Sequence, residues 1–216
     1  MSGATTNLQS IYLAMVHEAM ERLRASELFL ASYSTNSSLP FLEAAILQVR
    51  EALEAIAFAS IAPNRSKYET FRAKAEKQPD YTKDYHAGKI FHVLSKINKN
   101  FYPLALTPAT RQPDGSLHFD RKASGYLTNK RFESFYDRLG KHLHAHNPWS
   151  GNKNLQNLAA ELPTAIAEAF SLLELHATFI QTPEFKGVWV VEAKRETSAP
   201  SIITGNANGE FVVANS

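Results

Sequence analysis

Residues 138–148 concentrate side chains that can do chemistry. Their sequence is Arg-Leu-Gly-Lys-His-Leu-His-Ala-His-Asn-Pro, and it holds three of the eight histidines of the chain. Histidine changes charge near neutral pH and is also a common metal ligand. This His-rich segment (138–148) therefore predicts either an acid–base site or a metal site.

Arg138 and His144 are the pair with a direct use in metal-free cleavage of RNA. Such cleavage needs a base for the ribose 2′-hydroxyl, an acid for the leaving oxygen and a cation for the phosphorane charge. On an ideal helix these two side chains lie about 120° apart. They converge only if the helix is irregular at Gly140 or if a second subunit completes the site. The alternative is that Arg138 pairs with neighbouring acids and His144 packs or caps the helix.

His142 and His146 are four residues apart on one helical face, a spacing that can bind zinc. The segment offers no Asp or Glu as a third ligand, and His118 or His176 would have to come from elsewhere in the chain. The alternative is a solvated helix end, where His and Lys complement the negative pole of the helix dipole. We therefore expect no metal and no other cofactor.

Several neighbours of the His-rich segment have two interpretations. Asn147 either caps the helix before Pro148 or contacts a substrate. Arg50 and Glu54 form an i,i+4 pair on the most apolar predicted helix, so they either fix packing as an ion pair or orient the His-rich segment. A loose basic cluster with aromatic neighbours suits RNA, or is simply a solvated face; it comprises Lys122, Lys130, Arg131, Arg138 and Lys141, with His146 beside it.

The spacing of apolar residues predicts the elements that position these side chains. Helices are expected over 6–32, 40–62, 66–78, 83–99, 129–146 and 152–177. Thr128 is the expected N-cap of the fifth helix. Alternation around a Pro-Asp-Gly turn predicts a β-hairpin at about 104–120. Beyond the last helix, β-type runs at 178–181, 188–192 and 210–213 predict a small antiparallel β-meander, with a turn cluster at 205–209.

Two segments together resemble a known superfamily. They are residues 42–60, Leu-Glu-Ala-Ala-Ile-Leu-Gln-Val-Arg-Glu-Ala-Leu-Glu-Ala-Ile-Ala-Phe-Ala-Ser, and residues 136–148, which contain the His-rich segment. They resemble a group of small bacterial helical proteins and, more distantly, the HEPN superfamily, whose nucleases carry Arg, four to six residues, then His. Arg138 and His144 have five residues between them.

The resemblance implies a fold and a function. The expected fold is mainly α: a five- to six-helix HEPN-like bundle over 1–177, with the hairpin inserted, and a β appendage over 178–216 packed on it. HEPN nucleases are metal-independent and build a composite site from two subunits, so a homodimer is expected. Arg138 and His144 would be catalytic, His142 and Asn147 would assist, and Arg50 and Glu54 would support them.

Composition limits the alternatives. The 216 residues are 44% hydrophobic and 20% charged, carry a net charge of +2 and include no cysteine. Disulfides, thiolate nucleophiles and cysteine-based metal sites are therefore excluded. No phosphate-binding loop, nucleophile elbow or HExxH motif is present, which argues against nucleotide hydrolases, α/β-hydrolases and zincins. Without a signal peptide or a run of about 20 apolar residues, we expect a soluble cytoplasmic protein with no membrane contact.

The sequence thus supports three hypotheses. The first is a HEPN-like ribonuclease of a bacterial defence or toxin–antitoxin system. The second is a non-catalytic HEPN-like module that binds RNA or a partner protein such as a cognate antitoxin. The third is a His-ligated metal protein. Trp149 and Trp189 are expected in the core or in an interface.

Overall fold

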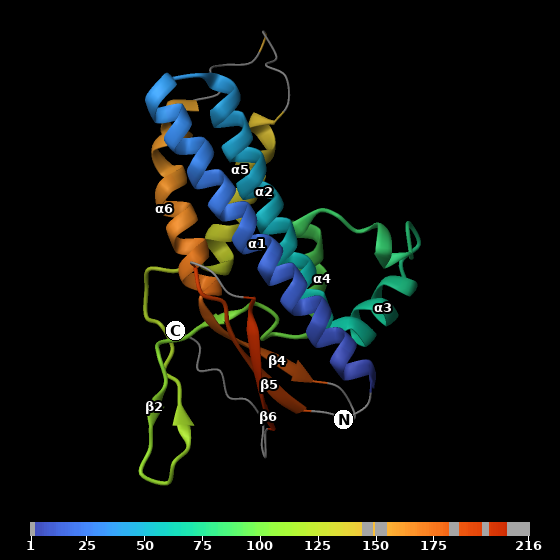
Figure 1. The fold of residues 1–216 in the computed structure, drawn as a ribbon. Coiled ribbons are helices and arrows are strands. Elements are labelled where there is room, and N and C mark those ends of the chain that lie inside the picture. The colour runs from blue at the N-terminus through green and yellow to red at the C-terminus, as the bar shows by residue number, and fades with distance from the viewer. Residues whose placement is uncertain (1–2, 144–148, 150–154, 182–185, 196–198, 207–216) are drawn as a thin grey trace.

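In the computed structural model of the protein, residues 3–143, 149, 155–181, 186–195 and 199–206 are described. Two long helices, α1 (Gly3–Asn36) and α2 (Leu39–Ile61), lie side by side along the molecule (Figure 1). The remaining helices pack around them or near their ends; they are α3 (Arg65–Ala73), α4 (Ala87–Ile97), α5 (Asn129–His142) and α6 (Leu155–Leu173). Two short 3₁₀ turns cover Ala62–Asn64 and Tyr81–Lys83. The prediction of a mainly α fold with a small antiparallel sheet is confirmed.

The sheet lies at one end of the helices (Figure 1) and has the strand order β1-β4-β5-β6, with every pair antiparallel. Its strands are β1 (Leu104–Ala105), β4 (Leu175–Gln181), β5 (Lys186–Glu192) and β6 (Ser201–Asn206). A separate hairpin pairs β2 (Thr110–Arg111) with β3 (Leu117–His118) around Gly115, whose φ of 85° suits glycine. The predicted 104–120 hairpin is therefore divided, because its first strand pairs with β4.

Two predicted boundaries in the C-terminal part are wrong. The last helix ends at Leu173 rather than at about 177, because residues from Leu175 onward pair with β5. The final described strand is Ser201–Asn206, where part of a turn cluster was expected, and its Ile-Ile-Thr run has high β-propensity. The strand predicted at 210–213 lies outside the described residues.

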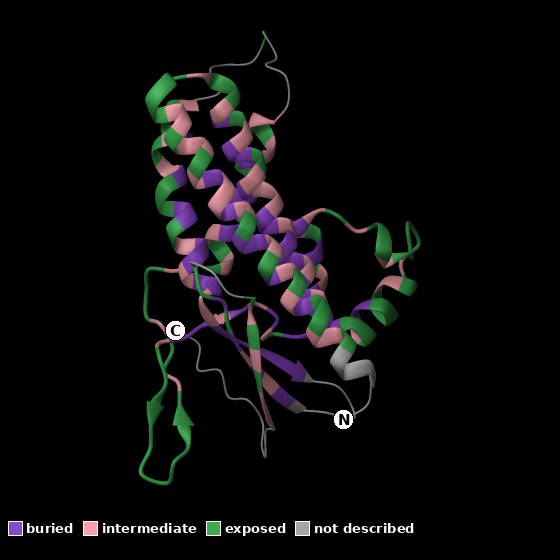
Figure 2. Cartoon of the chain, in the orientation of Figure 1, coloured by how far each residue is buried: buried purple, intermediate pink, exposed green. Residues whose placement is uncertain are grey.

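The helices and the sheet share one hydrophobic core. Helix α2 is apolar on most of its surface and buries residues on several faces, since α1, α4 and α5 pack against it. Trp189 and Val191 on the inner face of the sheet belong to the same cluster of buried side chains as the helices. Figure 2 shows the buried residues continuing from the helices into the sheet. The sheet therefore contributes to the interior on which the helices are assembled.

Candidate functional site

Helix α5 carries the first part of the predicted site. It begins at a true N-cap, because the Thr128 hydroxyl oxygen accepts a hydrogen bond from the Arg131 backbone N–H at 3.3 Å. The helix buries an aromatic and aliphatic stripe made of Phe132, Phe135, Tyr136 and Leu139. Arg131 and Arg138 extend from one edge of α5 toward α6, and polar side chains of α2 reach Tyr136 at the other edge.

The helix ends earlier than the sequence suggested. Its last residue is His142, not a residue near 146, and Leu143 is its C-cap. His144, His146 and Asn147 lie outside the described residues. The expected separation of about 120° between Arg138 and His144 assumed a continuous helix, so it does not apply. Arg138 and His142 are instead four residues apart on the last turns of α5, on one face of the helix.

The α6 edge of α5 holds two arginines in ion pairs, Arg138 exposed and Arg131 partly buried. Arg138 Nη2 lies 2.6 Å from Glu161 Oε1, and the side chain of Arg138 is 48% exposed. Arg131 Nε lies 2.6 Å from Glu168 Oε2. Lys130 and Lys141 are also exposed. Two of the predicted RNA-binding cations therefore already have carboxylate partners, and of the two Arg138 is the more open to solvent.

The α2 edge of α5 holds a more enclosed network. Arg50 Nε lies 3.3 Å from Glu54 Oε1, and the two side chains are 19% and 23% exposed. Arg50 also donates to the Tyr136 hydroxyl at 2.7 Å, with its guanidinium carbon 4.1 Å from the centre of the Tyr136 ring. The Tyr136 hydroxyl in turn donates to Glu54 at 2.7 Å. Burial, together with this bond to Glu54, raises the pKa of Tyr136 above its ordinary value, so the hydroxyl keeps its proton.

Glycine at position 140 makes room for this network. A Cβ atom on Gly140 would lie 2.5 Å from Nη1 of Arg50. The guanidinium therefore fills the space that a side chain would occupy on α5. Arg50 thus lies against Tyr136 and Gly140, and Glu54 contacts Tyr136, on the turns of α5 that precede His142.

His86 continues the polar region from α5 toward α4. Its ring centre lies 5.1 Å from that of Tyr136 in an edge-to-face arrangement. It is also the N-cap of α4, since its Nδ1 accepts from the Lys89 backbone N–H at 3.4 Å. His86 lines a pocket with several lysines, and sequence reasoning missed this pocket. The lysines concentrated in residues 74–89 are the sequence feature that could have indicated it.

The two distant histidines do not join the α5 site. His176 is fully buried; its Nδ1–H donates to the Leu173 carbonyl at 3.0 Å, and its Nε2 accepts from the Tyr12 hydroxyl at 2.8 Å. Burial lowers the pKa of His176 to about 4. His118 is exposed on β3, 3.2 Å from Asp120. Within the described ranges no three His, Asp or Glu residues are placed to hold a metal ion.

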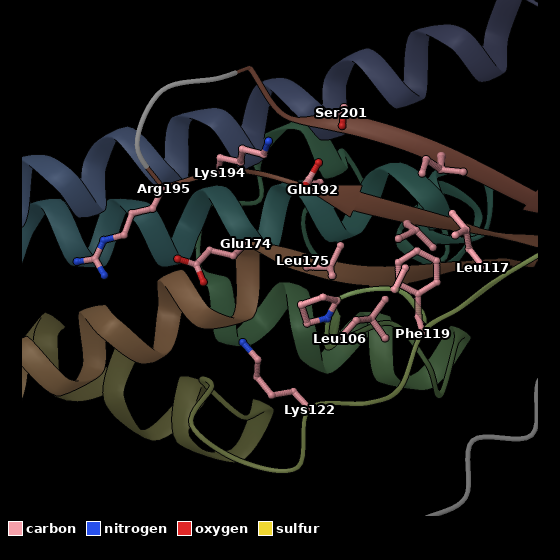
Figure 3. Close-up of a pocket in the computed structure, with 14 residues that line it drawn as sticks. Leu106, Leu117, Phe119, Lys122, Glu174, Leu175, Glu192, Lys194, Arg195 and Ser201 are labelled. Atoms are coloured by element: carbon pink, nitrogen blue, oxygen red, sulfur yellow. The ribbon is translucent and has the colours of Figure 1, made fainter. Parts of the chain in front are cut away.

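A larger cleft lies on the outer face of the sheet. It has a volume of about 600 Å³ and is bounded by the β2–β3 hairpin on one side and by β4, β5 and β6 on the other (Figure 3). Its walls are apolar at Leu106, Phe119 and Ile203. Glu174 and Lys122 lie toward its other end, where Lys122 donates to the Ser171 hydroxyl at 2.9 Å. The cleft has the size of a small-ligand site but contains none of the predicted catalytic residues.

Comparisons with known proteins give no functional assignment for this chain. No protein-family model, curated protein or solved structure matches the chain. None of the helices in the described part of the chain combines the length and apolar character that a membrane span requires.

Proposed function

We propose that this protein is a metal-independent endoribonuclease of the HEPN type, with its reacting groups at the C-terminal end of α5. The observation that carries the proposal is the placement of Arg138 and His142 on one face of the last turns of this helix. Arg138 is about half exposed, and its ion pair with Glu161 uses Nη2. A guanidinium has five N–H donors, so it can be held by Glu161 and still bind a phosphate.

In this proposal each residue has a defined role in transesterification. His144 removes the proton from the ribose 2′-hydroxyl or protonates the leaving 5′-oxygen, and a second histidine takes the opposite role. Arg138 stabilises the charge on the phosphorane. His142 and Asn147 assist by holding the substrate. Two subunits supply the two acid–base groups, as in the composite sites of the family that the sequence resembles.

The exposed Trp149 supports a partner surface next to the His-rich segment. Its residue surface is 93% exposed, whereas Trp189 is buried in the core. A large aromatic ring in solvent suits either a second subunit or a stacked base. The lysines and arginines of α5 would then attract the RNA backbone, and the biological setting would be bacterial defence or a toxin–antitoxin pair.

RNA cleavage in EDTA tests the proposal. Total RNA and tRNA are incubated with wild type, His144→Ala and Arg138→Ala. We expect wild type to cleave and both variants to lose about 100-fold or more in rate, in line with the loss of an acid–base or charge-stabilising group. Arg195→Ala is the matched control, because Arg195 is also a half-exposed arginine paired with a glutamate, Glu27. Cleavage by His144→Ala at the wild-type rate would rule out the assigned role.

A non-catalytic RNA- or protein-binding module is the second candidate. The ion pairs of Arg138 with Glu161 and of Arg131 with Glu168 favour it, since they give both cations a structural use. This candidate predicts that RNA binds without turnover and that Arg138→Ala lowers affinity alone. Gel-shift and cleavage assays on the same samples separate the two functions.

A further inference from the structure

The loop between α3 and α4 encloses a pocket that is rich in positive charge. This basic pocket has a volume of about 270 Å³. Its lining residues come from the end of α3, the connecting loop and the first turn of α4; they are Arg72, Lys77, Gln78, Lys83, Asp84, Tyr85, His86 and Lys89. Four of these are lysine or arginine and one is aspartate, so at neutral pH the lining has a formal excess of three positive charges.

The single carboxylate of the basic pocket is already engaged. Arg72 donates to both oxygens of Asp84, from Nε at 2.9 Å and from Nη2 at 2.8 Å. The Tyr68 hydroxyl donates to Asp84 as well, at 2.8 Å. The Arg72 and Asp84 side chains are only 16% and 14% exposed. Because a bidentate pair of this kind is strong, Asp84 serves to hold the loop and does not neutralise the lysines.

The same arginine holds the loop in an unusual conformation. Gln78 has a φ of 54°, in the left-handed region that non-glycine residues rarely adopt. Arg72 Nη2 donates to the Gln78 carbonyl at 2.8 Å, and the Gln78 side chain donates to the Lys83 carbonyl at 3.2 Å. These contacts fix the path of the loop, so the shape of the pocket is held by specific hydrogen bonds.

Three lysines and an aromatic ring remain available for a ligand. Lys77 and Lys89 are exposed, and the carboxylate near Lys83 is that of Asp80, at 3.7 Å in an exposed pair. Lys89 lies in the first turn of α4, where the helix dipole also favours an anion. Tyr85 is 70% exposed at the same pocket. Lysine ammonium groups bind phosphate, and an exposed aromatic face stacks on bases.

We propose that the basic pocket binds the phosphate of a nucleotide, with Tyr85 stacked on the base. The volume suits one nucleotide unit, and the unit is either free or part of an RNA strand. His86 lines the pocket and contacts Tyr136 of α5. A strand bound here would therefore pass close to α5. Binding at this pocket does not require cleavage at α5. The binding proposal can therefore be tested independently of the proposed ribonuclease activity.

Calorimetric titration of the full chain in EDTA tests this site. The probes are inorganic phosphate, AMP and a single-stranded RNA of about ten nucleotides, which fits the length that such grooves cover. The variants are Lys77→Ala/Lys89→Ala and Tyr85→Ala. The matched control is Lys96→Ala/Lys99→Ala, which removes two exposed lysines at the other end of α4. Urea midpoints confirm that every variant is folded.

We expect Lys77→Ala/Lys89→Ala to weaken binding of AMP and RNA about 10-fold or more and to lower the salt dependence of RNA binding by about 1 to 2 in the log–log slope. The control should stay within about 2-fold of wild type. Tyr85→Ala should weaken AMP and RNA but not inorganic phosphate. Equal affinities for AMP and RNA would identify a free nucleotide as the ligand, and much tighter RNA binding would identify a strand.

Two results would overturn the basic pocket as a nucleotide site. One is that wild type binds none of the three probes. The other is that Lys77→Ala/Lys89→Ala binds them as wild type does. Cleavage is measured in parallel, and His144→Ala should bind AMP at the basic pocket as wild type does. If RNA is cleaved and the pocket lysines have no effect on binding, the pocket is rejected and the ribonuclease proposal is retained.

Discussion

Two arginine–glutamate pairs lie along opposite edges of α5 in different surroundings. Toward α2, Arg50 and Glu54 enclose the Tyr136 hydroxyl and are about one-fifth exposed. Toward α6, Arg138 is 48% exposed in its pair with Glu161. Exposed ion pairs contribute about 0–1 kcal/mol, whereas breaking a largely buried pair costs several times more. The α2 edge therefore fixes the position of α5, and on the α6 edge the Arg138 guanidinium stays accessible to solvent.

Removing Arg50 should have the largest effect on stability. Arg50→Ala leaves Glu54 without its ion pair and removes the donor to the Tyr136 hydroxyl, in a region mostly shielded from water. We expect the free energy of unfolding to fall by about 3–4 kcal/mol. Arg138→Ala, the matched change on the α6 edge, should cost at most about 1 kcal/mol. Urea denaturation measures both, and equal losses would remove the distinction between the two edges.

The buried Tyr12–His176 pair should make stability depend on pH. Burial lowers the pKa of His176 to about 4 from an ordinary value of 6.5, so the unfolded chain binds more protons between these values. Stability is complete above about pH 6.5 and falls as the pH is lowered toward 4, by about 3 kcal/mol in all.

Urea midpoints at several pH values, with two matched variants, test this dependence. His176→Gln should remove most of the dependence between pH 6.5 and 4. His118→Gln, which changes an exposed histidine, should leave the dependence as it is in wild type. A wild-type stability that stays constant over this pH range would show that the interior does not hold His176 neutral.

The effect of Gly140→Ala on the free energy of unfolding should change sign when Arg50 is removed. In wild type, Gly140→Ala places a methyl group against the Arg50 guanidinium, 2.5 Å from Nη1, and we expect a loss of about 1–2 kcal/mol. In the Arg50→Ala background the obstacle is gone. Alanine should then stabilise the helix by about 1 kcal/mol, because glycine is the weaker helix former. Urea denaturation of the four proteins of this cycle measures the coupling, and the same sign in both backgrounds would show that Arg50 is not the reason for glycine.

The sequence predicted the helical part of the fold well. Each predicted helix overlaps an observed one, and Thr128 caps α5 as expected. Helix periodicity and capping act between residues a few positions apart, so one sequence reveals them. The Arg50–Glu54 pair was also visible, because an i,i+4 spacing brings two side chains together on any helix.

Helix ends and long-range partners were not predictable in the same way. The period of apolar residues near 142 and 174 does not show where tertiary contacts stop a helix. No local sequence pattern predicts that Glu161 pairs with Arg138 or that Glu168 pairs with Arg131. In each pair the residues are more than 20 positions apart in the sequence. The basic pocket was missed for the same reason, since its loop is held by Arg72 reaching across to Asp84.

The sequence by itself determined that the chain is mainly helical, that it has no cysteine chemistry, and that histidines and cations gather around one helix end. Only the tertiary structure decided that Leu104–Ala105 joins β4, that His176 is a core residue, and that α5 has one enclosed and one open polar edge. The physical reason is the sequence separation over which the interactions act. Local preferences depend on neighbouring residues, whereas strand pairing, burial and ion pairs depend on which distant segments meet in the folded chain.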